Sequence, residues 1–468
     1  MPYDGEFANK SSHMNLIKSP DVKEFLDKCK LLSPIDGKER DEIKKKFVMP
    51  TLKSDYLPEF IIAVDGSIYE SSVEEAIPST KMGYIKIGSL LIELNKYRLL
   101  NKKGGFVNPF EVAKLQQNNS SISFTLPSSN VILDGYKSVR DSFRAQLDKL
   151  LYEFRIKSDD PKTSLRSTLF YLASIRPNEF NTSLEERPHL FLHKCPNEEC
   201  DERDIRIEDL EEQIYCKCGE PIYPTDCLRI WEEINEYQSN VVALSRTMQV
   251  LEHLIPIHYI RCLEEQGSLD ILSKMAFILD GALAIFGPSA WLHASILRYI
   301  HLINKKLENN GYEPLFIMSL IKSGQVVDFV KMINSHIPNN RIFALNDAFR
   351  YKYISPGRRV PKNGHGYETY YGQDFIYKTP SGRVFVFNLV YPFESKTKPN
   401  LEVFKREKAN IEKYNSVLPK ALSLIEEFEC DLYENAVVPI ALAHRYTAIS
   451  MKPGGKILDL LTRKALIK

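Results

Sequence analysis

Two short apolar runs, each followed by an Asp-Gly pair, are the clearest pattern in the chain. Residues 60–64 lead into Asp65-Gly66, and residues 275–279 lead into Asp280-Gly281. Both runs have the length and the β-branched or aromatic content of a buried strand. The glycine predicts that each strand ends there in a turn. If the strands are neighbours, their carboxylates lie side by side, as the ligands of a hard divalent cation do. Taken alone, each Asp-Gly pair is more typical of a simple turn.

The remaining apolar pattern alternates between strands and helices and predicts an α/β fold. Helical spacing recurs over residues 135–175, 231–265 and 401–428. Further strands are expected over residues 84–94, 314–321 and 341–347, and residues 370–379 and 383–390 flank Pro380-Ser381-Gly382 as a hairpin. Loop-forming residues and cysteines set residues 100–230 apart, and we interpret this part as an insertion between core strands.

The longest helical pattern carries one acidic residue among apolar ones. Glu252 falls on a stripe at helical spacing whose other members are Val241, Ser245, Met248, Ile255 and Tyr259. A carboxylate on a core-facing stripe is costly unless it is paired or binds a metal, so Glu252 is our candidate for a third ligand. Glu264, near the helix end, is the alternative.

Four cysteines form two close pairs within the insertion. Cys195 and Cys200 are separated by four residues, and Cys216 and Cys218 by one. Two cysteine pairs about fifteen residues apart predict a zinc ribbon or knuckle, in which four thiolates leave no open position for substrate. His193 or Cys227 can replace one ligand, and four unliganded thiols are the alternative.

Several cations and one histidine follow apolar runs at positions where they can meet a substrate. Lys322 comes directly after a predicted strand, and Lys378 lies in an aromatic hairpin of the kind that stacks bases and holds phosphates. His444 and Arg445 end the apolar run 436–443. The simpler interpretations are a surface lysine, a cross-strand aromatic core and a structural histidine.

Charge and composition narrow the class of protein. Over 468 residues the net charge is +1, so nucleic-acid binding has to come from local patches. The chain has no Gly-x-x-x-x-Gly-Lys-Ser/Thr motif, which argues against ATP hydrolysis by the chain itself. No apolar run reaches membrane-spanning length, and the start of the chain does not resemble a signal peptide. Eight cysteines without such a signal favour a reducing compartment, and we expect a cytoplasmic protein.

Together, these motifs resemble the NurA nuclease family. The resemblance rests on residues 63–67, 277–283 and 441–445, and on the helix with an acidic residue before the second Asp strand. It implies an RNase H-like core over residues 51–99 and 231–468. A helical leader over residues 1–50 and the zinc-binding insertion over residues 100–230 complete the expected organisation. Asp65, Asp280 and His444 match the family's metal-binding residues, and Glu252 or Glu264 supplies the helical carboxylate.

The resemblance also implies a function and partners. We expect a Mn²⁺- or Mg²⁺-dependent deoxyribonuclease that is dimeric and works with a HerA-type hexameric ATPase, in DNA-end resection or in anti-phage defence. Lys322, Lys378 and Arg445 are the candidate DNA contacts. Oxygen-rich ligation with one imidazole suits these ions better than zinc. A catalytically silent adaptor of the ATPase, which uses its zinc module for contacts, is the alternative from another class. An RNase H-like enzyme acting on RNA or a hybrid shares the same site.

Overall fold

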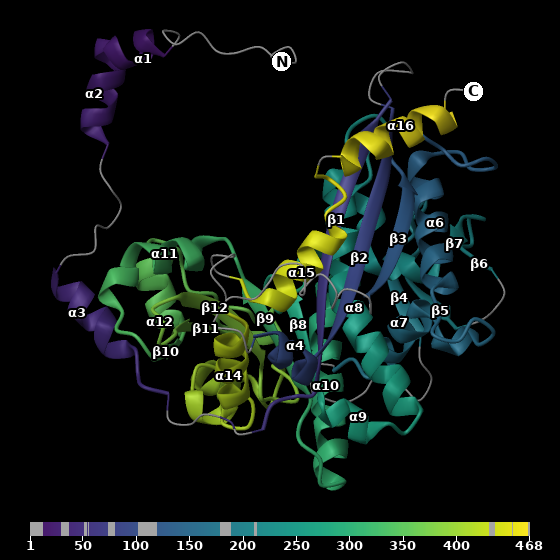
Figure 1. The fold of residues 1–468 in the computed structure, drawn as a ribbon. Coiled ribbons are helices and arrows are strands. Elements are labelled where there is room, and N and C mark those ends of the chain that lie inside the picture. The colour runs from purple at the N-terminus through teal and green to yellow at the C-terminus, as the bar shows by residue number, and fades with distance from the viewer. Residues whose placement is uncertain are drawn as a thin grey trace.

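The core of the computed structural model is an eight-stranded mixed sheet (Figure 1). The structure describes residues 13–29, 37–50, 54, 56–73, 80–101, 119–177, 189–209, 213–429, 436–451 and 453–466. The strands follow the order β10-β11-β12-β9-β8-β1-β2-β3. Their bounds are β1 Phe60–Ser72, β2 Lys81–Glu93, β3 Asn119–Pro127, β8 Met275–Asp280, β9 Phe316–Ile321, β10 Arg341–Ala344, β11 Gly372–Lys378 and β12 Val384–Val390.

Strand directions give the sheet its RNase H-like character. β1, β2 and β3 form an antiparallel meander, and β8 and β9 run parallel to β1 on its other side. Across the sheet these five strands lie in the order β3-β2-β1-β8-β9. Numbered one to five along the chain, this is the order 3-2-1-4-5 of the RNase H-like sheet, as expected. β12, β11 and β10 extend it in antiparallel fashion, and the predicted hairpin around Pro380-Ser381-Gly382 joins β11 to β12.

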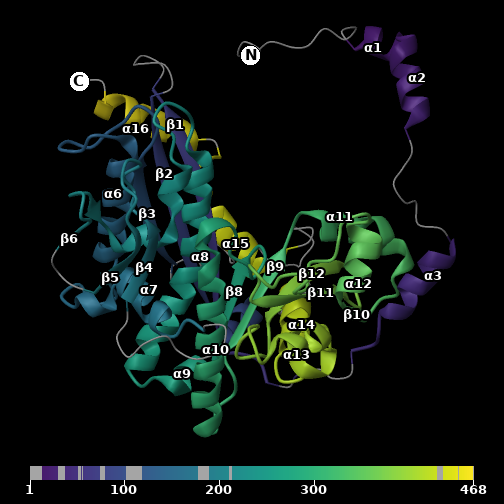
Figure 2. The ribbon, with the colours of Figure 1, turned by 180° about the vertical axis from the view of Figure 1, so that it is seen from behind.

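Helices cover both faces of the sheet because successive side chains of each strand point to opposite sides. On β1, Val64 packs into one core, whereas Ile61 and Ala63 pack into the other. Figure 2 shows α8 and α10 on the first face, and Figure 1 shows α15 crossing the second. The first core is completed by α6 Val139–Glu153, α7 Leu165–Ser174, α8 Val241–Glu265 and α10 Leu292–Asn309. The second is completed by α4 Leu94–Asn101, α14 Leu418–Phe428 and α15 Val438–Thr447.

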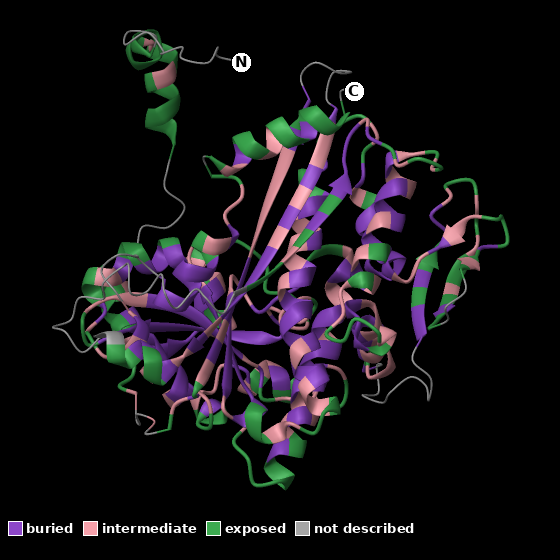
Figure 3. Ribbon diagram, turned by 45° about the vertical axis from the view of Figure 1, so that its right-hand side comes forward, coloured by how far each residue is buried: buried purple, intermediate pink, exposed green. Residues whose placement is uncertain are grey.

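The other described elements lie around this core, and Figure 3 shows that the central strands carry the most buried residues. The small strands are β4 His189–Lys194, β5 Arg203–Glu208, β6 Ile214–Tyr215 and β7 Pro221–Ile222. The other helices are α1 Met14–Lys18, α2 Pro20–Lys28, α3 Gly37–Lys46, α9 Leu269–Ser273, α11 Gln325–Ile333, α12 Asp347–Phe349, α13 Leu401–Glu407 and α16 Gly454–Leu466. None of the described helices is both long and apolar enough to cross a membrane.

The predicted end of the first Asp strand is wrong. β1 continues past Asp65 to Ser72, and Gly66 pairs with Ile87 of β2 instead of forming a turn. Gly66 is needed there for space, since an added Cβ would lie 2.7 Å from Met248 Cγ of α8. At the second strand the prediction is confirmed, because β8 ends at Asp280 and Gly281 adopts a φ of +88°.

Two other predicted boundaries also differ from the structure. β3 lies in the core sheet beside β2, so residues 119–127 are not part of an insertion that starts at residue 100. Serine and asparagine at its start suggest a loop, but this edge strand buries Phe124, Leu126 and Pro127 and leaves Ser123 and Thr125 exposed. The long helix begins at Val241, and residues 230–233 form a short 3₁₀ turn before it.

Candidate metal centre

Neighbouring parallel strands bring the two predicted aspartates together. Val64 of β1 pairs with Leu279 of β8, and the next residues along the strands are Asp65 and Asp280. Asp65 lies within β1 and is only 3 % exposed, whereas Asp280 is the last residue of β8 and is half-buried. The sheet thus holds two carboxyl groups side by side on rigid backbone, as the sequence pattern predicts.

The third member of the cluster comes from the far end of the chain. His444 on α15 places Nδ1 3.2 Å from Oδ2 of Asp65. One ligand atom from each of Asp65, Asp280 and His444 lies within 4.8 Å of the others. Thr447 also faces this site, and its hydroxyl donates to Oδ2 of Asp65 over 2.6 Å. The sequence analysis missed Thr447, although its spacing of three residues from His444 places both on one helix face.

Glu252 also lines this cavity. It lies on α8, on the face of the sheet opposite to α15 and His444. A hydrogen bond from the backbone of Gly66 holds its carboxyl group, and a Cβ at residue 66 would lie 2.8 Å from Glu252 Oε1. Glu252 lines the cavity with Asp65 and Asp280 but stands outside the tight group of three ligand atoms.

The alternative carboxylate, Glu264, is engaged elsewhere. It accepts a hydrogen bond from Tyr299 Oη over 2.8 Å and one from Lys306. Glu264 does not line the cavity that holds Asp65 and Asp280. The geometry therefore favours Glu252 as the helical carboxylate.

Unbalanced negative charge shapes the electrostatics of the cluster. The pKa of Asp65 is raised to about 6, first by burial and then by the adjacent Asp280 carboxyl, while the Thr447 hydroxyl and Lys322 oppose the shift. Burial, Asp65 and Asp280 raise the pKa of Glu252 well above its usual value. Lys322, directly after β9, lies with Nζ 2.7 Å from Oδ2 of Asp280. One lysine does not balance three carboxyl groups, so a bound cation would be favourable here.

The donor set fits a hard divalent cation. Carboxylate oxygens and one imidazole are ligands that Mn²⁺ accepts, and Mg²⁺ takes carboxylates readily. With metal–oxygen bonds of about 2.1 Å, ligand atoms of an octahedral ion lie about 3 to 4 Å apart. The mutual separation within 4.8 Å is compatible with such a shell after small side-chain rotations.

The structure brings only one of the predicted DNA contacts to the acidic cluster. Lys322 lies there, but Lys378 is buried and donates to the carbonyl oxygen of Asn334 over 2.8 Å. The aromatic residues of its hairpin, such as Phe375 and Phe387, stack on each other within the core. Arg445 is exposed beside His444 and does not line the cavity.

The cavity extends well beyond the acidic cluster. Its volume is about 930 Å³, and it holds a second set of polar residues that the sequence analysis did not single out as a site. These are Arg350, Tyr351, Ser355, Arg358, His365, Tyr370 and Asp374. They come from three separate segments, so no local spacing in the sequence marks them as a group.

The four predicted cysteines form a separate compact cluster. Cys195 and Cys200 follow β4, and Cys216 and Cys218 lie between β6 and β7. Their Sγ atoms lie within 4.8 Å of one another, with 3.8 Å between Cys195 and Cys218 and 3.7 Å between Cys200 and Cys216. A tetrahedral zinc site with Zn–S bonds of about 2.3 Å has Sγ–Sγ edges of about 3.8 Å.

The alternative zinc ligands stand apart from this cluster. The ring of His193 is exposed and lies against Asp204, and Cys227 is buried near Trp291, which donates to its carbonyl oxygen. Neither belongs to the described group of four thiols. The geometry is thus that of a four-cysteine site.

Comparison with known proteins gives a family for the chain. The NurA domain model matches residues 60–449, and no curated protein matches the sequence. Among solved structures, the NurA nuclease from Sulfolobus solfataricus is 9 % identical with a TM-score of 0.33, over 97 % of this chain and 94 % of that one. A further NurA structure is 11 % identical with a TM-score of 0.29, over 97 % and 98 %. A NurA structure with manganese is 13 % identical with a TM-score of 0.25, over 98 % and 99 %. Because the domain model spans most of its length, the chain belongs to the NurA family.

Proposed function

We propose that the chain is a divalent-metal-dependent deoxyribonuclease that hydrolyses phosphodiester bonds. The observation that carries the proposal is the convergence of Asp65, Asp280 and His444 in one open cavity of a NurA-family chain. His444 is half-exposed and the cavity is large, so a substrate can approach the ligands. An open coordination site is what metal-assisted hydrolysis requires.

Each residue of the cluster has a role in this proposal. Asp65, Asp280 and His444 hold Mn²⁺ or Mg²⁺, and Thr447 fixes the carboxylate of Asp65. The ion, when bound, polarises the phosphodiester and lowers the pKa of a coordinated water. Glu252 adds a carboxylate that can bind the ion or accept a proton from water.

Two cations are placed to meet the substrate's negative charge. Lys322 is held beside Asp280 and can turn its ammonium group to the scissile phosphate. Arg445 follows His444 on the exposed side of α15, where a DNA backbone that approaches the site would pass.

The four-cysteine cluster is proposed to hold a structural zinc ion. Its Sγ separations support this role, and four thiolates leave no coordination position for substrate. The cluster packs on the main core through neighbouring apolar residues such as Leu192 and Ile222. We therefore assign it to stability and not to hydrolysis.

We further propose that the nuclease is a cytoplasmic homodimer that acts with a HerA-type hexameric ATPase. The absence of a phosphate-binding loop from the sequence supports a motor supplied by another protein. DNA-end resection in repair and degradation of phage DNA are the two roles this assembly would serve.

Cleavage of linear and circular DNA with Mn²⁺, with Mg²⁺ or with EDTA tests the central proposal. We expect metal-dependent loss of linear DNA, and its abolition in Asp65→Asn and Asp280→Asn variants that unfold at an unchanged or higher temperature. Glu252→Gln and Glu264→Gln form a matched pair on one helix, and only the first should impair cleavage. Full activity in both aspartate variants would refute the proposal. An inert wild type, even with its cognate ATPase, would favour the adaptor.

A further inference from the structure

The far end of the cavity is built differently from the acidic end. Arg350, just after α12, is 7 % exposed and forms an ion pair with Asp374 of β11. Asn388 of β12 donates to the same carboxylate and fixes it in place. Two of the strands that extend the sheet, β11 and β12, thus hold an arginine in the wall of the cavity that also contains Asp65, Asp280 and His444.

Two buried nitrogen atoms at this end have no hydrogen-bond partner within the described part of the chain. They are Nε of Arg350 and Nε2 of His365, and both residues line the cavity. Nε of Arg350 is always a donor, and a buried donor without an acceptor costs about 1–3 kcal/mol, a cost that a ligand oxygen would remove. Nε2 of His365 is a donor or an acceptor according to the tautomer of the ring. The guanidinium of arginine is well suited to phosphate oxygens, because its donors form a rigid fork.

A basic loop forms the rim at the same end. Residues 355–364 contain Arg358, Arg359 and Lys362 and no acidic residue, and all three cations are exposed. Arg358 also lines the cavity. The loop is held at both ends: Ser355 Oγ donates to Gln325 Oε1 over 3.1 Å, and the residue after the loop, His365, donates its N–H to Asp347 over 3.0 Å. Three positive charges are therefore held at one place beside the cavity.

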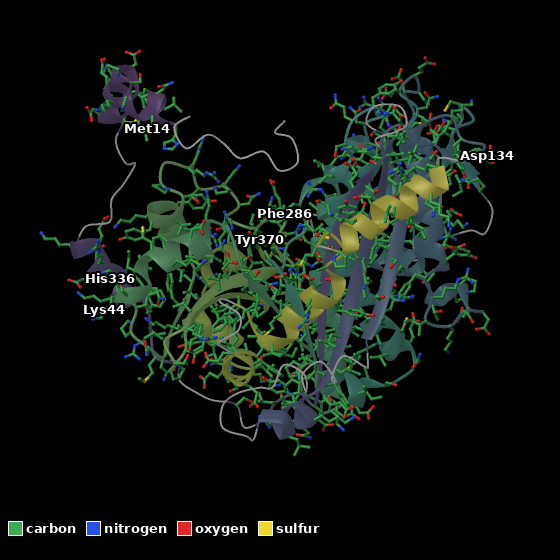
Figure 4. The ribbon with its side chains drawn as sticks, turned by 45° about the horizontal axis from the view of Figure 1, so that its top comes forward. Met14, Lys44, Asp134, Phe286, His336 and Tyr370 are labelled. Carbon is green, nitrogen blue, oxygen red and sulfur yellow. The ribbon has the colours of Figure 1, made fainter. Side chains whose placement is uncertain are left out.

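An aromatic residue lines the same cavity as Arg358. Tyr370 lines the cavity, and its ring meets His365 at 5.1 Å and the edge of Phe286 at 5.8 Å between centroids. Phe286 is 37 % exposed. Figure 4 shows Phe286 and Tyr370 close together above the middle of the sheet. Aromatic side chains next to cations are the pattern that binds unpaired nucleic-acid strands, because bases stack on the rings and phosphates meet the cations.

We propose that this end of the cavity is a strand-binding subsite that takes a phosphate and a base of an unpaired nucleic-acid strand, away from the scissile phosphate. The inference rests on the proposed nuclease function. Arg350 receives the phosphate inside the cavity, the basic loop holds the backbone at the rim, and Tyr370 or Phe286 stacks the base. A duplex lying against the rim reaches Arg358 and Arg359, but its phosphates do not reach the buried Arg350. The subsite therefore selects an unpaired strand.

Binding without added Mn²⁺ or Mg²⁺ tests the subsite without cleavage and leaves the proposed structural zinc ion in place. A fluorescent single-stranded oligonucleotide and the duplex of the same sequence are titrated with wild type and with Arg358→Ala/Arg359→Ala/Lys362→Ala. We expect the triple variant to bind the single strand at least about tenfold more weakly. Its slope of log affinity against log salt should fall by about two, since each phosphate contact with a single strand contributes about 0.7. Unchanged affinity and slope, or a wild type that binds neither probe, would overturn the inference.

A matched triple variant controls for the loss of net charge. Lys137, Lys305 and Lys413 are exposed and lie outside the cavity lining. Lys137→Ala/Lys305→Ala/Lys413→Ala removes the same three charges and should bind the single strand as wild type does. An equal loss in both triple variants would mean that general charge, and not the loop, holds the strand.

Arg350→Lys tests the buried end and keeps its charge. Lysine can still pair with Asp374 but lacks Nε and the planar fork, so we expect weaker single-strand binding with duplex binding unchanged. Thermal unfolding checks that the variant is folded, and Tyr370→Leu provides a second route to the same end of the cavity. Wild-type single-strand binding by both variants would refute the buried subsite.

Cleavage assays separate this inference from the proposed function. If the loop variant cleaves with a raised KM and an unchanged kcat, both proposals hold. If wild type binds the strand but never cleaves it, the nuclease proposal fails and the subsite stands. If the loop variant cleaves with the wild-type KM and kcat, the subsite fails and the nuclease stands.

Discussion

The two clusters of side chains that could hold a metal ion in the described part of this chain are assembled in opposite ways. The four cysteines lie within residues 195–218, on two small hairpins and their turns. The acidic cluster draws on residues 65, 280 and 444, which meet only because β1, β8 and α15 are neighbours in the folded chain. One cluster is local and closed, and the other is distributed and open to a large cavity.

This difference has a consequence for stability. The thiols lie at Sγ–Sγ distances of 3.7 and 3.8 Å, so the zinc ion proposed for them would contribute folding free energy when it binds. At the acidic cluster the protein buries Asp65 beside a second carboxyl group, and burial first and Asp280 second raise the pKa of Asp65 to about 6. Such a site lowers stability until a cation is bound, which is typical of sites arranged for chemistry.

The largest expected effect is on the local cluster. Cys216→Ala removes one of the four thiols, whereas Cys227→Ala removes a buried cysteine outside the cluster. We expect wild type and Cys227→Ala to hold about one zinc ion per chain, and Cys216→Ala to lose it and unfold at a clearly lower temperature. Metal analysis and thermal unfolding measure both. Equal zinc content in the two variants would show that the thiols bind no ion.

A smaller effect is expected where α8 packs against β1 at the distributed cluster. Gly66→Ala places a Cβ 2.7 Å from Met248 Cγ and 2.8 Å from Glu252 Oε1, so the helix must shift. We expect a loss of about 1–3 kcal/mol in the free energy of unfolding, together with reduced cleavage. Gly37→Ala, where the added Cβ meets no atom within 4 Å, is the control and should match wild type. Equal stability of the two variants would argue against a close fit at residue 66.

The same contrast explains what the sequence could predict. The four cysteines stand out because a zinc module needs its ligands close together along the chain. Asp65 and Asp280 are predictable because the apolar run before each aspartate is typical of a buried strand. The similarity of the two runs suggests that these strands lie next to each other in one sheet. Thr447 and the Arg350–Asp374 pair were missed, because their roles depend on which segments the sheet brings together.

Strand ends and loop composition were the weak points of the sequence analysis. Gly66 was interpreted as a turn, although here glycine makes room for a helix inside a strand that continues to Ser72. β3 was interpreted as part of a loop-rich insertion because its exposed face carries serine. In both cases the structure is determined by packing against a distant segment, α8 for Gly66 and β2 for β3, and not by the propensity of the local residues.

The last expected effect is a pH dependence that the acidic cluster imposes on stability. The pKa of Asp65 is about 6 in the folded chain and 3.8 for an ordinary aspartate, so the folded state binds this proton more tightly. Unfolding releases it between about pH 4 and pH 6, and the free energy of unfolding therefore falls as pH rises through this window. Asp65→Asn lacks this term. Without added Mn²⁺ or Mg²⁺, we expect wild type to lose stability relative to Asp65→Asn from pH 4 to pH 6.5, as measured by chemical denaturation.

The neighbouring Glu252 also has a raised pKa, so both proteins keep some slope and only their difference reports Asp65. Addition of Mn²⁺ at pH 7 should raise the stability of wild type more than that of Asp65→Asn, because the ion is held by the carboxylate that the variant lacks. The cysteine cluster should be indifferent to this addition once its zinc is bound. If the free energies of unfolding of wild type and Asp65→Asn change in parallel with pH when no Mn²⁺ or Mg²⁺ is added, the position of Asp65 does not lower stability. In that case the distributed cluster would be as compatible with the fold as the local one, and the contrast between them would be one of geometry alone.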